Sequence, residues 1–139
     1  MIEIGIWYER GEEMKRITML ICVAFMAFTA RAQNVTPLLT KDIPEFSGKE
    51  VEMITVEYAP GAVDPIHRHN AQVFVYVLEG NVIMQVRGGA QQELGPGQTF
   101  YEGPNDVHTV GRNASKTRPA KFLVFFIKNK NAPILTPVQ

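Results

Sequence analysis

The sequence predicts an all-β domain, a small barrel or sandwich of short strands. Two segments, 73–78 and 122–127, are apolar at every position, as in strands that are covered on both faces. No stretch after residue 32 has the period of a long amphipathic helix. Between residues 49 and 127, short segments of strand-like composition are separated by turn signals, namely Gly80-Asn81, Gly88-Gly89, Gly95-Pro96-Gly97 and Gly103-Pro104.

Length and charge limit the number of domains and the classes of partner. The chain has 139 residues, 45% of them hydrophobic, and a formal net charge of zero, which fits one globular domain. A neutral chain has no electrostatic reason to bind nucleic acid or an anionic membrane. We therefore expect no nucleic-acid partner.

The N-terminal segment has the composition of a secretory signal peptide. Residues 14–32 begin with two basic residues, continue with an apolar run and end at Ala30 and Ala32, the small residues that a signal peptidase prefers. We expect cleavage after Ala32, a periplasmic or secreted mature chain, and no membrane attachment thereafter. Residues 1–13 are then an upstream extension from a misassigned start. Cleavage removes Cys22, the only cysteine, so the mature chain has no disulfide or thiolate site.

The remaining chain divides into three parts. Residues 33–49 contain Pro37, Pro44 and Gly48 and predict an extended arm with at most a short strand. Residues 50–128 hold the alternating and apolar segments of the barrel, and residues 129–139 form a C-terminal tail. Two triplets match N-glycosylation acceptors, Asn34-Val35-Thr36 and Asn113-Ala114-Ser115.

Three histidines are the candidate metal ligands. His67 and His69 lie two residues apart, and residues at this spacing in an extended chain point to the same side. His108 lies in a second segment, GPNDVHTV, at the edge of a candidate strand. Because imidazole binds divalent transition metals, the three side chains predict one metal ion, with Fe, Mn, Zn, Ni and Cu as candidates.

The histidine segments resemble the two signature motifs of the cupin superfamily, whose members are small jelly-roll β-barrels that usually hold a divalent metal. Gly61, His67, His69 and Gly80 fit the first motif, and Gly97, Pro104 and His108 fit the second, where Asn113 falls one residue late. The resemblance covers about residues 50–128 and implies a single jelly-roll cupin domain, a double-stranded β-helix.

The sequence departs from the cupin pattern at Val73, which stands where the family has a glutamate ligand. Gln72 is the nearest oxygen-bearing residue, and a bulge after His69 and Asn70 would turn it toward the metal. We therefore include Gln72 with the three histidines as a candidate ligand. Glu102 is a candidate catalytic base or a partner of the ligands, and Tyr101 a candidate for orienting a substrate.

Cupins include enzymes as well as proteins that only bind. The resemblance implies a metal-dependent enzyme, dioxygenase-like or isomerase-like, acting on a small organic molecule in the barrel mouth. The alternatives are a non-catalytic cupin that binds a small ligand or metal, and a barrel that has lost its metal. We expect apolar lining from Val75, Val77, Met84 and Val110. Apolar residues on both faces of two strands also predict a homodimer, unless the N-terminal arm covers the outer face.

Overall fold

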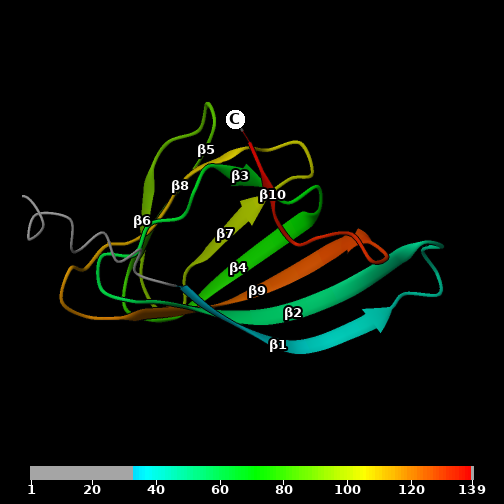
Figure 1. Cartoon of the computed structure of the whole chain (residues 1–139), viewed down its shortest axis with the longest axis horizontal. Coiled ribbons are helices and arrows are strands. Elements are labelled where there is room, and N and C mark those ends of the chain that lie inside the picture. Colours follow the sequence, from blue (N-terminus) through cyan, green and yellow to red (C-terminus); the bar gives the residue numbers. More distant parts are fainter. Residues whose placement is uncertain (1–32, 139) are drawn as a thin grey trace, which may run out of the picture. The chain divides into compact units, whose positions relative to one another are not determined.

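The barrel consists of two antiparallel sheets with an apolar core between them (Figure 1). The computed structural model describes residues 33–138, and the predicted signal peptide and upstream extension lie outside this range. One sheet has the order β1-β2-β9-β4-β7 and the other β10-β3-β8-β5-β6. The strands are β1 (Gln33–Asp42), β2 (Lys49–Tyr58), β3 (His67–Arg68), β4 (Gln72–Glu79), β5 (Val82–Val86), β6 (Gln92–Leu94), β7 (Thr99–Glu102), β8 (His108–Asn113), β9 (Ala120–Asn129) and β10 (Thr136–Pro137). This architecture confirms the predicted all-β jelly roll.

The two fully apolar segments lie in β4 and β9, which are neighbouring strands of one sheet. In β4 the side chains of Val73, Val75 and Val77 are buried, and the alternate residues face outward. β9 pairs with β4 in regular register over Gln72 to Val77 and buries its own alternate set. The outer face of these strands therefore carries exposed aromatic and aliphatic side chains, among them Phe74, Tyr76 and Leu78.

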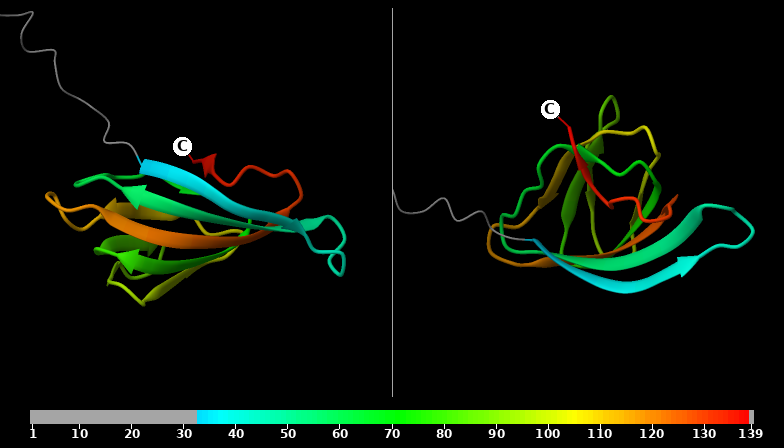
Figure 2. Two further views of the ribbon diagram at one scale, coloured as in Figure 1. Left: turned by 90° about the horizontal axis from the view of Figure 1, so that it is seen from below. Right: turned by 45° about the vertical axis from the view of Figure 1, so that its right-hand side comes forward.

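The N-terminal arm is a ten-residue strand, longer than the sequence predicts. β1 pairs with β2 along its whole length, with a shift of register between Pro37 and Leu39. Because β1 is an edge strand, a proline that cannot donate a ladder hydrogen bond is accommodated there. Leu38 and Phe46 remain exposed, so the arm extends the edge of the sheet and does not cover its outer face (Figure 2).

Asn113 fixes the turn between β8 and β9. It is 4% exposed, and its Nδ2 donates to the carbonyl oxygens of Tyr58, Ala59 and Arg118 at 3.3, 3.1 and 2.8 Å. Its Oδ1 accepts a hydrogen bond from the backbone N–H of Ser115. One buried amide therefore satisfies four backbone groups, which ties the turn to the end of β2.

The C-terminal tail is part of the second sheet. β10 pairs with β3, with Thr136 opposite Arg68 and Pro137 opposite His67. The backbone N–H of Val138 also donates to the carbonyl of Ile66. Residues 33–138 contain no helix long and apolar enough to cross a membrane.

Candidate metal centre

Two short elements bring the three histidines together. His67 begins β3, and its Cα partner across the strand pair is His108, the first residue of β8. Side chains opposite each other in an antiparallel pair lie on the same face, so both rings point into the barrel. His69 follows two residues later, before Asn70 adopts a positive φ of 51° and turns the chain into β4.

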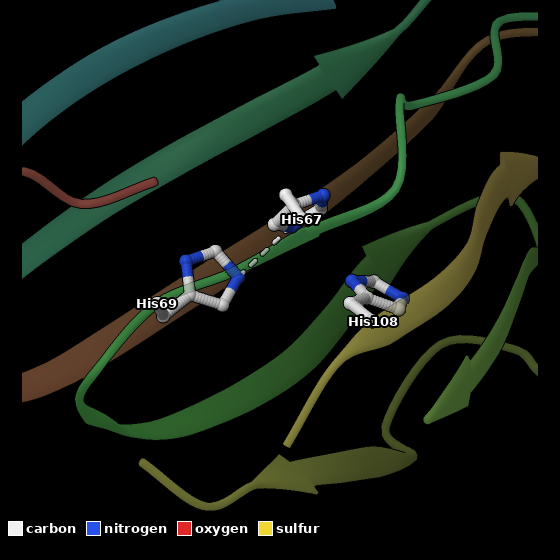
Figure 3. A group of neighbouring side chains, drawn as sticks. All are labelled: His67, His69 and His108. Carbon is white, nitrogen blue, oxygen red and sulfur yellow. Dashed lines mark hydrogen bonds between the residues drawn. The ribbon is translucent and has the colours of Figure 1, made fainter. Parts of the chain in front are cut away.

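The three imidazoles meet at one point, with a ligand atom of each lying within 4.8 Å of the others (Figure 3). The Nε2 atoms of His67 and His69 are 3.1 Å apart, and the ring centroids of His67 and His108 are 4.9 Å apart. His67 and His108 are buried and His69 is half-buried. The structure therefore places the three predicted histidines close enough together to share one ion.

Two of the rings are held by backbone carbonyl groups, which determine which ring nitrogens face the other histidines. His67 Nδ1 lies 2.8 Å from the carbonyl oxygen of Pro65, and His69 Nδ1 bonds to that of Ile134. A carbonyl only accepts, so each Nδ1 must carry the hydrogen, and in the neutral ring Nε2 then presents a lone pair. Two lone pairs facing each other at 3.1 Å repel unless a cation or proton lies between them, so this donor set fits a metal.

His108 is a buried imidazole at the start of β8. Neither ring nitrogen has a partner of normal hydrogen-bond geometry among residues 33–138. The backbone of Val110 nevertheless acts to raise the pKa of the ring. Burial, together with His67 and His69 nearby, lowers the pKa of His108 to about 4. Burial also lowers the pKa of His69 to about 4. Both rings are therefore neutral at pH 7, the protonation state in which imidazole binds metals.

Glu102 reaches the same point from β7. Its Oε1 lies 3.6 Å from His108 Nδ1 and its Oε2 lies 3.7 Å from His69 Nε2. Burial is the main reason that the pKa of Glu102 is raised to about 8, and the charges of Asp106 and Asp64 raise it further. Without a cation the carboxyl group is protonated at neutral pH, and a bound divalent ion would favour its ionised form.

The other two site residues that the sequence suggested lie on the opposite face of the sheet. Gln72 keeps the regular alternation of β4, with no bulge after Asn70, so its side chain points outward where that of Val73 points inward. There its Oε1 accepts a hydrogen bond from the hydroxyl of Tyr101, which is 51% exposed. The structure therefore brings neither Gln72 nor Tyr101 to the histidines.

A narrow cavity of about 60 Å³ opens beside the three rings. By the rule that one buried water needs roughly 10–15 Å³, this space suits a few waters or a compact organic molecule. Val75 and Met84 line it as expected, whereas Val77 and Val110 do not. The other apolar lining comes from the sheet that contains β1, β2, β4 and β9 and from the C-terminal segment: Val35, Ile54, Val56, Val73, Phe122, Val124, Phe126, Ile134 and Leu135.

Sequence reasoning missed a second polar group on the cavity wall. The hydroxyl of Tyr58 donates a hydrogen bond to Asp64 Oδ2, and both residues line the cavity. Burial raises the pKa of both groups. Gly111 makes the close packing possible, because a Cβ there would lie 2.9 Å from Asp64 Oδ2 and 3.0 Å from His108 Cε1. The Asp64-Pro65 turn directly before His67 was the available sequence signal.

The C-terminal segment also contributes to the site. Ile134 supplies the carbonyl that orients His69, and its side chain and that of Leu135 line the cavity. No sequence pattern predicted this role, because it depends on a pairing of only two residues between β10 and β3.

Comparisons with known proteins agree with this fold. Over an alignment of 71 residues the chain is 35% identical to auxin-binding protein T85 of Nicotiana tabacum, and the match covers 45% of this chain and 38% of that protein. The structure of oxalate oxidase in complex with the substrate analogue glycolate superposes with a TM-score of 0.61 and 26% identity, over 80% of this chain and 57% of that chain. DMSP lyase DddQ from Ruegeria pomeroyi DSS-3, at 20% identity, shares the fold with a TM-score of 0.64, over 82% of this chain and 55% of that chain.

This chain therefore spans between 38% and 57% of the length of these three proteins, and two of them are enzymes. Residues 54–126, just over half of its length, match the cupin domain family. Its two-sheet barrel with three convergent histidines is the arrangement that the family resemblance implies. The chain belongs to the cupin domain family.

Proposed function

We propose that this chain is a metal-dependent cupin enzyme that acts on a compact, partly apolar organic molecule in the barrel cavity. The observation that carries the proposal is the convergence of His67, His69 and His108 beside that cavity, with the Nε2 atoms of His67 and His69 facing each other. A divalent ion held there supplies a Lewis acid that polarises a substrate oxygen and lowers the pKa of a bound water.

The cavity walls indicate the kind of molecule that would fit. Most of the lining is apolar, so the body of a substrate would lie against residues such as Val73 and Phe126 while one oxygen or sulfur faces the histidines. Asp64, hydrogen-bonded by Tyr58, is a group on the wall that could accept or hold a proton during turnover. Oxalate oxidase, whose structure contains glycolate, is a neighbour whose ligand has this compact size.

Metal content is the first test, on protein purified without a histidine tag. We expect close to one equivalent of a transition metal in the wild type and less than a tenth in the His67→Ala variant. Under a tenth of an equivalent in folded wild-type protein, even after incubation with Fe²⁺, Mn²⁺, Zn²⁺, Ni²⁺ and Cu²⁺, would refute the proposal and favour a barrel that has lost its metal.

Turnover is the second test. Oxygen uptake and product formation are measured with short diketones, thiols, phenols and 2-hydroxy acids such as glycolate, with the His67→Ala protein as control. The dioxygenase-like reading requires oxygen uptake, and an isomerase-like or lyase-like reading requires product without it. Metal bound in full with no conversion of any compound would instead identify a non-catalytic cupin.

We also place the mature protein outside the cytoplasm. Residues 14–32 have signal-peptide composition, and the small residues Ala30 and Ala32 directly precede Gln33. Mass spectrometry of the exported chain tests this reading, and we expect an N-terminus at Gln33. A mature peptide that contains Trp7 would refute both the cleavage and the upstream start.

A further inference from the structure

Glu102 is a buried carboxylate that stands directly across from the position where the cupin pattern has its glutamate. Val73 on β4 and Glu102 on β7 are Cα partners in the antiparallel pair, and they are 0% and 2% exposed. Opposite residues of such a pair have Cβ atoms roughly 4.5–5.5 Å apart on the same face. A glutamate at either position therefore projects into the same part of the barrel.

The carboxylate oxygens lie a few tenths of an ångström beyond the separation of ligands that share an ion. Donor atoms bound at about 2.1 Å to one metal are roughly 3.0–3.4 Å apart, depending on whether the geometry is octahedral or tetrahedral. The two Nε2 atoms of His67 and His69 are 3.1 Å apart, and the Glu102 oxygens are 3.6 and 3.7 Å from His108 and His69. The last two distances are too long for hydrogen bonds, so the carboxylate is not held by the imidazoles.

No other described residue compensates the charge of this carboxylate. Among residues 33–138, the only basic side chains within 4 Å of the Glu102 carboxylate are those of His69 and His108, and no lysine or arginine lies that close. Its Oε2 has no hydrogen-bond partner in the same range, and the negative charges of Asp64 and Asp106 act on it unfavourably. An ionised carboxylate in such a place is costly unless a cation is bound beside it.

We infer that Glu102 is the fourth protein ligand of the metal, supplied by β7 in place of the carboxylate that other cupins supply from β4. This inference rests on the proposed metal centre of three histidines. The carboxylate then comes from a different strand, but the ligands are still three imidazoles and one carboxylate. The ion therefore keeps one anionic ligand. The wall at Val73 is then free to stay apolar and to contact the substrate.

A charge-relocation experiment tests this assignment. Mn²⁺ affinity is measured by competition with a chelator, and Co²⁺ is used as a spectroscopic probe of the ligands, in protein stripped of metal. The variants are Glu102→Gln, Glu102→Val, and the double variant Val73→Glu/Glu102→Val, which moves the carboxylate to the neighbouring strand. The control is Glu50→Gln, which removes a buried carboxylate on β2 that does not line the cavity.

We expect Glu102→Gln and Glu102→Val to weaken Mn²⁺ binding by about 100-fold or more, at or beyond the 10- to 100-fold typical of partners that only orient a ligand. The Co²⁺ absorption bands should shift in both variants, because the anionic carboxylate ligand is lost. The double variant should regain affinity to within about tenfold of the wild type. Glu50→Gln should leave both the affinity and the bands unchanged.

Three results would overturn the inference, and they differ from one another. Wild-type Mn²⁺ affinity in Glu102→Gln would show that the histidines suffice, while the proposed metal centre stands. Weaker binding with unchanged Co²⁺ bands would make Glu102 a positioning residue. Failure of folded wild-type protein to bind any of the probe metals would refute the metal centre itself. If the double variant does not fold, as judged by circular dichroism, Glu102→Asp replaces it, and a carboxylate ligand predicts an affinity between those of wild type and Glu102→Gln.

Discussion

Because the pKa of Glu102 is raised, the metal-free protein should lose stability as pH rises toward 8. The substitution Glu102→Gln should abolish this pH dependence. The carboxyl group has a pKa of about 8 in the folded chain against an ordinary value near 4.5. Between these values the folded state binds a proton that the unfolded state has lost, so stability falls as pH rises toward 8. The slope approaches 1.4 kcal/mol per pH unit, and between pH 6.5 and 8 the loss is about 1.5 to 2 kcal/mol.

Other groups face Glu102, and they set the lower limit of this window. His69 and His108 have folded pKa values of about 4, below their ordinary 6.5, so they reduce stability as pH falls from 6.5 toward 4. The charges of Asp64 and Asp106 disfavour the ionised form of Glu102. Asp64 has a raised pKa of its own. All four groups are retained in Glu102→Gln, so their effects largely cancel when the variant is compared with wild type.

The assay is urea unfolding in the presence of a strong chelator at pH 6.5, 7.25 and 8, for wild type and Glu102→Gln. We expect the wild type to lose about 1.5 to 2 kcal/mol across this range and the variant to change by less than about 0.5 kcal/mol. Equal slopes for the two proteins would refute the claim that the Glu102 carboxyl is buried and protonated in the metal-free barrel.

Three further predictions test other parts of the structure. Gly111→Ala should displace His108, because the added methyl would lie 3.0 Å from its ring, and we expect metal affinity to fall by about tenfold and stability by about 1–3 kcal/mol. Asn113→Ala should cost about 3 kcal/mol in urea unfolding, since three carbonyls and one N–H each lose the hydrogen bond to Asn113, and a loss under 1 kcal/mol would contradict the role of this amide. If a second copy covers the outer face of β4, Phe74→Asp should convert a dimer to a monomer in light scattering, while Phe46→Asp, on the exposed arm, should not.

The histidines and the core strands were predictable because their signals are local. The His-x-His spacing fixes two side chains on one side of an extended segment, and a strand that is apolar at every position is readily recognised. The place of His108 in the site came from the family pattern, and the structure explains it by its pairing with His67.

The phase and pairing of the short strands could not be read from the sequence. Phe100 and Tyr101 are adjacent aromatics, so composition does not tell which of them faces inward. Because side chains alternate along a strand, Glu102 faces inward only if Phe100 does, as the structure shows. Gln72 faces outward because the turn at Asn70 sets the phase of β4. The carbonyl of Ile134 reaches His69 across 65 positions in the chain, a contact without any local pattern.

The buried amide of Asn113 has a practical consequence for producing this protein. Asn34 and Asn113 both match the acceptor triplet for attached sugars, but only Asn34 is exposed in the folded chain. An oligosaccharide added to Asn113 during passage through a eukaryotic secretory pathway would occupy the nitrogen that bonds three carbonyls, and the turn before β9 could not close. Yeast or insect-cell expression should therefore yield misfolded material unless this triplet is removed, for example by Ser115→Ala, whereas a bacterial host avoids the problem.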